Sequence, residues 1–158
     1  MNMKKKKWIP YAVFIGAALL VGAAGGIVTK NGMPWYERAI KPSFTPPSVL
    51  FPIVWTILYI LMGFGMARVW TRGGGQKMRA LIVYAVQLVI NLLWSVWFFG
   101  LQAYGFAFFW LLLLIAAVVL MTLEFARGDR LAGWLQLPYI LWCIFAAILN
   151  RAVWLLNR

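Results

Sequence analysis

The stretch GFAFFWLLLLIAAVVLMTLEFA, residues 105–126, decides the fold class of this chain. Glu124 is its one charged side chain, and nearly all the other residues are apolar. Because a helix of about 20 apolar residues is long enough to cross the hydrocarbon core of a bilayer, this stretch predicts a transmembrane helix. Four more stretches have a similar length and composition, so we predict five spans at about residues 8–28, 47–70, 78–99, 105–126 and 132–155.

The composition of the whole chain indicates the same class of protein. Of its 158 residues, 65% are hydrophobic and 11% are charged, whereas soluble domains are about 45–50% apolar and 25% charged. One soluble core of this size cannot bury so much apolar surface. We therefore predict an all-α integral membrane protein with a single domain over residues 1–158, a bundle of five transmembrane helices whose longest connection is the loop at 29–46.

The distribution of basic residues predicts the orientation in the membrane. Of the 15 Lys and Arg residues, ten fall on the side of the N-terminus, beginning with Lys4 to Lys7, and five fall on the other side. The positive-inside rule then places the N-terminus in the cytoplasm and the C-terminus and loop 29–46 outside. Because the basic residues lie at the ends of apolar runs and not on one face, we expect contact with membrane lipid and no nucleic-acid partner.

Several kinds of chemistry are excluded by the residues that the chain lacks. It has no histidine and one cysteine, Cys143, and its acidic residues are Glu37, Glu124 and Asp129. A paired acid and base, a Ser/His triad and a dense metal cluster all need groups that are missing here. We expect no metal site and no required cofactor.

Tryptophan is the most unusual feature of the sequence, with ten residues, and several of them lie inside predicted spans. Helical spacing places pocket-forming side chains on one face of spans two, three and five, in the groups Trp55 with Tyr59, Asn91 with Trp94, and Trp142 with Ala146 and Asn150. At about 1.5 Å per residue from the outer ends, Trp55, Asn91 and Ala146 lie about 12–13 Å deep.

This common depth predicts an aromatic pocket with one or two amides, open towards loop 29–46. The loop then serves as a lid, with Trp35 and Tyr36 available to close it. The alternative is a packed core between helices, in which Asn91 and Asn150 bond each other or a backbone carbonyl.

Glycines and prolines predict where the helices approach one another or bend. Gly22 and Gly26 form a GxxxG pattern, which permits close helix packing within the bundle or between two copies. Pro52 and Pro138 fall within predicted spans, where proline removes an N–H and bends the helix. Such a bend either widens a cavity or accommodates bundle packing.

Taken together, the motifs resemble those of the TspO/MBR family, the tryptophan-rich sensory proteins and translocator proteins, also called peripheral-type benzodiazepine receptors. The resemblance covers about residues 8–155 and has the expected order of five spans. It rests on three blocks: Trp35-Tyr36, Lys41-Pro42, Pro46-Pro47, Phe51, Val54-Trp55 and Leu58-Tyr59; Asn91, Trp94-Ser95 and Phe98-Phe99; Pro138-Tyr139, Trp142, Ala146 and Leu149-Asn150.

The resemblance implies a bundle that binds porphyrins and other flat aromatic ligands, including those of benzodiazepine receptors, as a homodimer in a bacterial cell membrane. It implies pocket positions at Trp55, Trp94, Trp142, Ala146 and Leu149, with Tyr36 and Asn91 close by, and the spacing adds Asn150. Because no histidine is present to ligate haem iron, free-base protoporphyrin IX fits this sequence better than haem. The sterol motif of the family is incomplete, because Leu149-Asn150-Arg151-Ala152 lacks its tyrosine, so the sequence does not support cholesterol binding.

Three functions follow as hypotheses. The favoured one is a membrane receptor or sensor for tetrapyrroles. The second is a light- and oxygen-dependent porphyrin-degrading activity, suggested by the resemblance, in which Trp55 and Trp142 participate as the catalytic residues. The third is a carrier of porphyrins or other lipophilic ligands, although the charged residues of the predicted spans lie near their ends, which argues against coupling to protons or ions.

Overall fold

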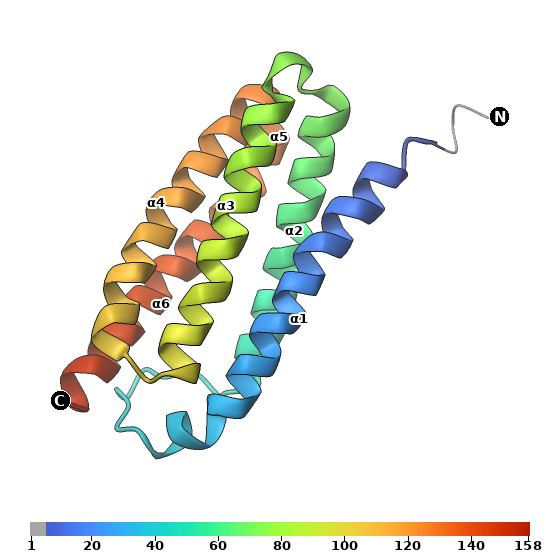
Figure 1. The fold of residues 1–158 in the computed structure, drawn as a ribbon. Helices are drawn as coiled ribbons and strands as arrows, with labels where there is room; N and C mark the ends of the chain where they lie inside the picture. Colours follow the sequence, from blue (N-terminus) through green and yellow to red (C-terminus); the bar gives the residue numbers. More distant parts are fainter. Residues whose placement is uncertain (1–5) are drawn as a thin grey trace.

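The computed structural model describes residues 6–158, which form an antiparallel helical bundle (Figure 1). Five segments in this part of the chain are long and apolar enough to cross a membrane. Residues 6–158 contain no strand, so the predicted all-α class with five spans is confirmed. Lys4 and Lys5, which contribute to the predicted orientation, lie outside the described residues. The elements are α1 (Ile9–Arg38), α2 (Leu50–Arg72), η2 (Gly74–Gln76), α3 (Lys77–Ser95), η3 (Val96–Gly100), α4 (Tyr104–Gly128), α5 (Arg130–Trp134) and α6 (Leu137–Leu156).

The predicted loop at 29–46 is wrong in its first half, because α1 continues to Arg38 and the connecting segment comprises residues 39–49. Two features hold this extra helix in place. The Tyr36 side chain is buried, 4% exposed, and packs on the ring of Phe99 at 5.6 Å between centroids. The Lys41 ammonium donates to the Tyr36 and Glu37 carbonyls at 2.7 and 3.0 Å, which satisfies helix-end acceptors that lack a partner.

The fifth span is divided into two helices rather than bent at a proline. Asp129 caps α5, since its Oδ1 accepts the Ala132 N–H at 2.9 Å. Gln136 lies in the break and donates from Nε2 to the Leu61 carbonyl at 3.1 Å. Pro138 stands in the first turn of α6, where its missing N–H costs nothing. The predicted bend at Pro138 is therefore replaced by a helix start.

Helix α1 is the least buried of the five spans, and Figure 1 shows its N-terminal half slanting away from the bundle. Of its most apolar window, 11% is buried, against 28–39% in the other spans. It approaches α2 closely at Gly63, where an added Cβ would collide with the backbone of Ile15. The Tyr84 hydroxyl also donates to the Phe14 carbonyl at 2.6 Å, which fastens this end of α1 to α3.

An ion pair joins two elements at the end of the bundle far from residues 39–49. Arg68 of α2 donates from Nε and Nη2 to the two carboxylate oxygens of Asp129, at 3.0 and 2.8 Å. The hydrogen bonds from Arg68 hold the pKa of the Asp129 carboxyl below its usual range. Such a two-bond pair fixes geometry as well as charge, so it anchors the α4–α5 turn to α2.

Candidate ligand-binding site

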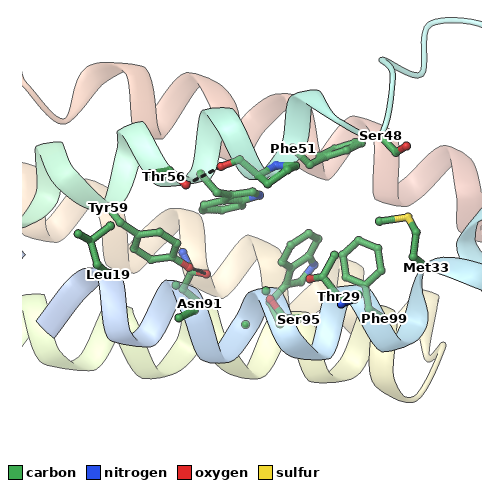
Figure 2. Close-up of a pocket in the computed structure, with 18 of the residues that line it drawn as sticks. Leu19, Thr29, Met33, Ser48, Phe51, Thr56, Tyr59, Asn91, Ser95 and Phe99 are labelled. Carbon is green, nitrogen blue, oxygen red and sulfur yellow. Dashed lines mark hydrogen bonds between the residues drawn. The ribbon is translucent and has the colours of Figure 1, made fainter. Parts of the chain in front are cut away.

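A cavity of about 610 Å³ lies between α1 and α2, with α3 as its floor. We call it the main cavity. Its volume is within the range of about 300–1,000 Å³ that is usual for small-molecule sites. In Figure 2, Leu19 and Tyr59 lie at one end, Ser48 and Met33 lie at the other, and Phe51 faces Phe99 across the opening.

Small residues on α1 create this volume. A Cβ added at Gly22 would lie 2.6 Å from Cδ2 of Tyr59, so glycine lets the tyrosine ring pass under the helix. An added Cβ at Gly26, one turn further on, would meet no atom within 4 Å, and Gly26 lines the main cavity. Within one chain, Gly22 of the GxxxG pattern thus permits a close contact between helices, and Gly26 leaves open space in the main cavity.

A second hollow of about 20 Å³, the small chamber, lies on the other side of an aromatic wall. Four side chains line both spaces and so form this wall: Phe51, Trp55, Trp94 and Phe99. The rings of Trp55 and Trp94 lie 6.2 Å apart, and Phe51 meets Trp142 edge-on at 6.0 Å. These distances are typical of favourable aromatic pairs.

The predicted site residues are therefore divided between the two spaces. Asn91 lines the main cavity, and Trp55 and Trp94 line both. The others line the small chamber alone, namely Tyr36, Trp142, Ala146, Leu149 and Asn150. The structure brings all eight into one neighbourhood but places the open volume on the α1 side of Trp55.

A chain of hydrogen bonds fixes the floor of the main cavity. The Tyr59 hydroxyl donates to Asn91 Oδ1 at 2.9 Å, and Asn91 Nδ2 donates to the Tyr139 hydroxyl at 2.6 Å. The Tyr139 hydroxyl in turn donates to Gln87 Oε1 at 2.8 Å. Because all four groups are buried, these bonds lock α2, α3 and α6 together.

Asn150 positions an indole rather than facing the main cavity. Its Oδ1 accepts the Trp94 Nε1–H at 3.2 Å, and its Nδ2 donates to the Tyr104 carbonyl at 2.8 Å. The side chain thus bonds a backbone carbonyl across helices, in the manner of the alternative packed core. Trp94 is held in the wall as a result.

The short π-helix η3 carries Phe99, one of the four side chains of the aromatic wall. The Leu101 N–H bonds the Val96 carbonyl at 2.8 Å, five residues back, which widens the last turn. Phe98 and Phe99 are consecutive, yet both are buried. They pack around Tyr36, with ring centroids 6.0 and 5.6 Å away.

The connecting segment at residues 39–49 is fastened to the C-terminal end of α6. The Ile40 N–H donates to Asn157 Oδ1 at 2.9 Å, and Asn157 Nδ2 returns a bond to the Ile40 carbonyl at 2.8 Å. Trp35, predicted to close the pocket, is 55% exposed and lines neither space. Ser48 and Val49, at the end of the segment, do line the main cavity.

The α1 wall is the part of the site that the sequence did not reveal. It contributes Leu19, Gly22, Ala23, Gly25, Gly26, Thr29, Lys30 and Met33. The signal for this wall was the run of small residues at 22–26, which by itself is equally typical of helix packing. Trp97, also inside a predicted span, packs on Phe106 and Trp110 at 5.1 and 5.9 Å, away from both spaces.

Residues 6–158 contain no cluster of metal-ligating side chains. Fold and site together define a polytopic α-helical membrane protein with an aromatic cavity between its helices. Residues 14–155 match the model of the TspO/MBR family, so the chain belongs to this family and is an integral membrane protein.

Known members of the family align over nearly their whole length. The chain is 40% identical to the tryptophan-rich protein TspO of Chlorobaculum tepidum, with 96% of this chain and 98% of the relative covered. It is 35% identical to the translocator protein of Homo sapiens, over 93% of this chain and 89% of the relative. It is 34% identical to the tryptophan-rich sensory protein of Cereibacter sphaeroides, over 99% and 95%.

Proposed function

We propose that this protein is a membrane receptor or sensor that binds porphyrins, and also aromatic ligands of the benzodiazepine-receptor type, in the main cavity. The observation that carries the proposal is an apolar cavity of about 610 Å³ walled by the rings of Phe51, Trp55, Trp94 and Phe99. Flat aromatic molecules gain the most from such a wall, since ring faces offer large contact area at fixed geometry. In the simplest version of the proposal, the ligand is free-base protoporphyrin IX.

The orientation and assembly state belong to the same proposal. With the N-terminus in the cytoplasm of a bacterial cell, the main cavity opens near the outer surface of the membrane. A homodimer stays a prediction of the family resemblance, and the proposal does not depend on it.

Two unpaired donors in the small chamber support a role for its residues in binding. Among residues 6–158, the Tyr36 hydroxyl and Trp142 Nε1 are buried and have no hydrogen-bond partner. A buried donor without an acceptor costs about 1–3 kcal/mol. A ligand that displaces the Phe51 ring gains access to both donors, because Phe51 packs against Tyr36 and Trp142.

The test is a titration of protoporphyrin IX into detergent-purified protein in the dark, followed by tryptophan quenching. We expect saturable quenching whose Kd rises roughly two- to tenfold in Trp55→Phe, since an aromatic contact contributes about 0.5–1.5 kcal/mol. Trp134→Phe is the matched control, because Trp134 is 64% exposed and lines neither space. Equal loss of affinity in both variants, or no saturable quenching, argues against the proposal.

The second candidate function is light- and oxygen-dependent porphyrin degradation. It is favoured by the position of Trp55, which touches both spaces, and by the unpaired indole N–H of Trp142. Illumination of the loaded protein in air should then convert the porphyrin to a new pigment, and Trp55→Phe and Trp142→Phe should slow this conversion after correction for occupancy. A porphyrin spectrum that stays constant under light contradicts the degrading activity and leaves the sensor as the proposed function.

A further inference from the structure

Lys30 is the one charged side chain among the residues that line the main cavity. It stands on α1 between Gly26 and Met33, at spacings of four and three residues, and both neighbours line the same cavity. Lys30 lies eight residues before the end of α1, so it is about 12 Å inward from that end. The Lys30 side chain is exposed, so its ammonium stands at the open edge of the aromatic cavity, where a bound ligand can reach it.

Among residues 6–158, no acidic side chain forms an ion pair with Lys30. The chain has three acidic residues, and two of them pair elsewhere, Asp129 with Arg68 and Glu124 with Arg127. The third, Glu37, is seven residues further along α1, beyond the three- or four-residue spacing at which side chains pair on a helix. Among residues 6–158, the ion pairs do not include Lys30.

The other cations at this end of α1 are differently placed. Arg38 lies over the ring of Trp35, with its guanidinium carbon 5.8 Å from the centroid. The Lys41 ammonium is bound to backbone carbonyls at the end of α1. Neither lines the main cavity. Thr29 and Ser48, which carry hydroxyl groups, line it towards the same end as Met33 (Figure 2).

We propose that the Lys30 ammonium binds a carboxylate carried on the rim of the ligand, so that this residue determines a preference of the main cavity for an acidic ligand over its neutral analogue. This inference rests on the proposed function and names the chemical class that the site prefers. The apolar rings hold the aromatic body, and the cation holds the acidic edge at the mouth. A charge-assisted hydrogen bond of this kind is stronger than a neutral one and fixes how the ligand enters.

The test compares protoporphyrin IX, which carries two carboxylates, with its dimethyl ester, which has the same ring system and no charge. Both are titrated in the dark into wild-type protein, Lys30→Gln and Arg151→Gln, in an uncharged detergent. Arg151 is the matched control, since it is an exposed cation on α6 that lines neither space. We expect Lys30→Gln to weaken binding of the free acid about three- to fivefold, because a solvent-exposed ion pair contributes up to about 1 kcal/mol.

The ester should bind all three proteins equally within about twofold, and Lys30→Arg should retain the preference for the acid. Equal weakening of acid and ester in Lys30→Gln would show that Lys30 only shapes the cavity and overturns the inference. Equal weakening of the acid in Lys30→Gln and Arg151→Gln overturns it as well, because bulk charge would then be responsible. Unchanged binding of both ligands in Lys30→Gln overturns the inference and leaves the proposed function intact. Failure of the wild-type protein to bind either ligand removes the proposed function itself.

Discussion

Filling the main cavity from α1 should weaken porphyrin binding without unfolding the protein. Gly26 is the position for this change, because an added Cβ there meets no atom within 4 Å and the residue lines the main cavity. In Gly26→Leu, the new side chain enters space that the ligand needs. Forcing an extra side chain into occupied space costs about 1–3 kcal/mol, which corresponds to roughly five- to 150-fold in Kd.

Gly16→Leu is a closely matched control for this experiment. Gly16 is on the same helix, an added Cβ there also meets no atom within 4 Å, and it does not line the main cavity. Leucine is the better helix former by up to about 1 kcal/mol, so neither variant should be less stable than the wild type. The assay is the dark titration of protoporphyrin IX together with thermal unfolding in detergent. Wild-type affinity in a folded Gly26→Leu protein would refute the placement of the ligand between α1 and α2.

Two further predictions concern the polar groups that hold the bundle together. Tyr59→Phe removes the donor to Asn91 Oδ1 and leaves that oxygen buried, so the free energy of unfolding should fall by about 1–3 kcal/mol, measured by thermal unfolding in detergent; an unchanged Tm would mean that the amide finds another donor. Hydrogen bonds from Arg68 are the main cause of the lowered pKa of Asp129 in the folded protein. The stability that this shift gives is fully present above the unfolded-state pKa of about 3.9. It is lost as the pH falls through the lower folded-state pKa. Wild-type Tm should therefore decline below about pH 4 more steeply than that of Asp129→Asn, and parallel curves would show that this pair contributes nothing.

Local hydropathy was sufficient to predict the five spans, because each transmembrane helix must satisfy its own backbone hydrogen bonds within one apolar stretch. The ends of the helices were harder to predict. Residues 29–38 contain Lys30 and Pro34 and were expected to form a loop, yet they are helical because Tyr36 packs on Phe99 and Lys41 caps the helix end. The contact of Tyr36 with Phe99 joins two distant parts of the chain, so no local pattern shows it.

The candidate site was predicted in part. Helical spacing identified Trp55, Asn91 and Trp94, which do line the main cavity, because residues three or four apart share a face. It could not show that Asn150 is used to position Trp94, since that bond joins α3 to α6. The position of Lys30 on the wall of the main cavity also escaped, because a lysine near the end of a span normally extends to the membrane surface.

The sequence by itself therefore determined that this protein folds in a lipid bilayer, that it has five spans and that its interior is aromatic. Only the tertiary structure decided on which side of Trp55 the open volume lies. A cavity is the space left where helices fail to touch, and here it depends on the contact of Gly63 with Ile15, the passage of Tyr59 beneath Gly22 and the empty space at Gly26. Each of these depends on how closely α1 approaches the rest of the bundle, which is a property of long-range packing and not of any one stretch of sequence.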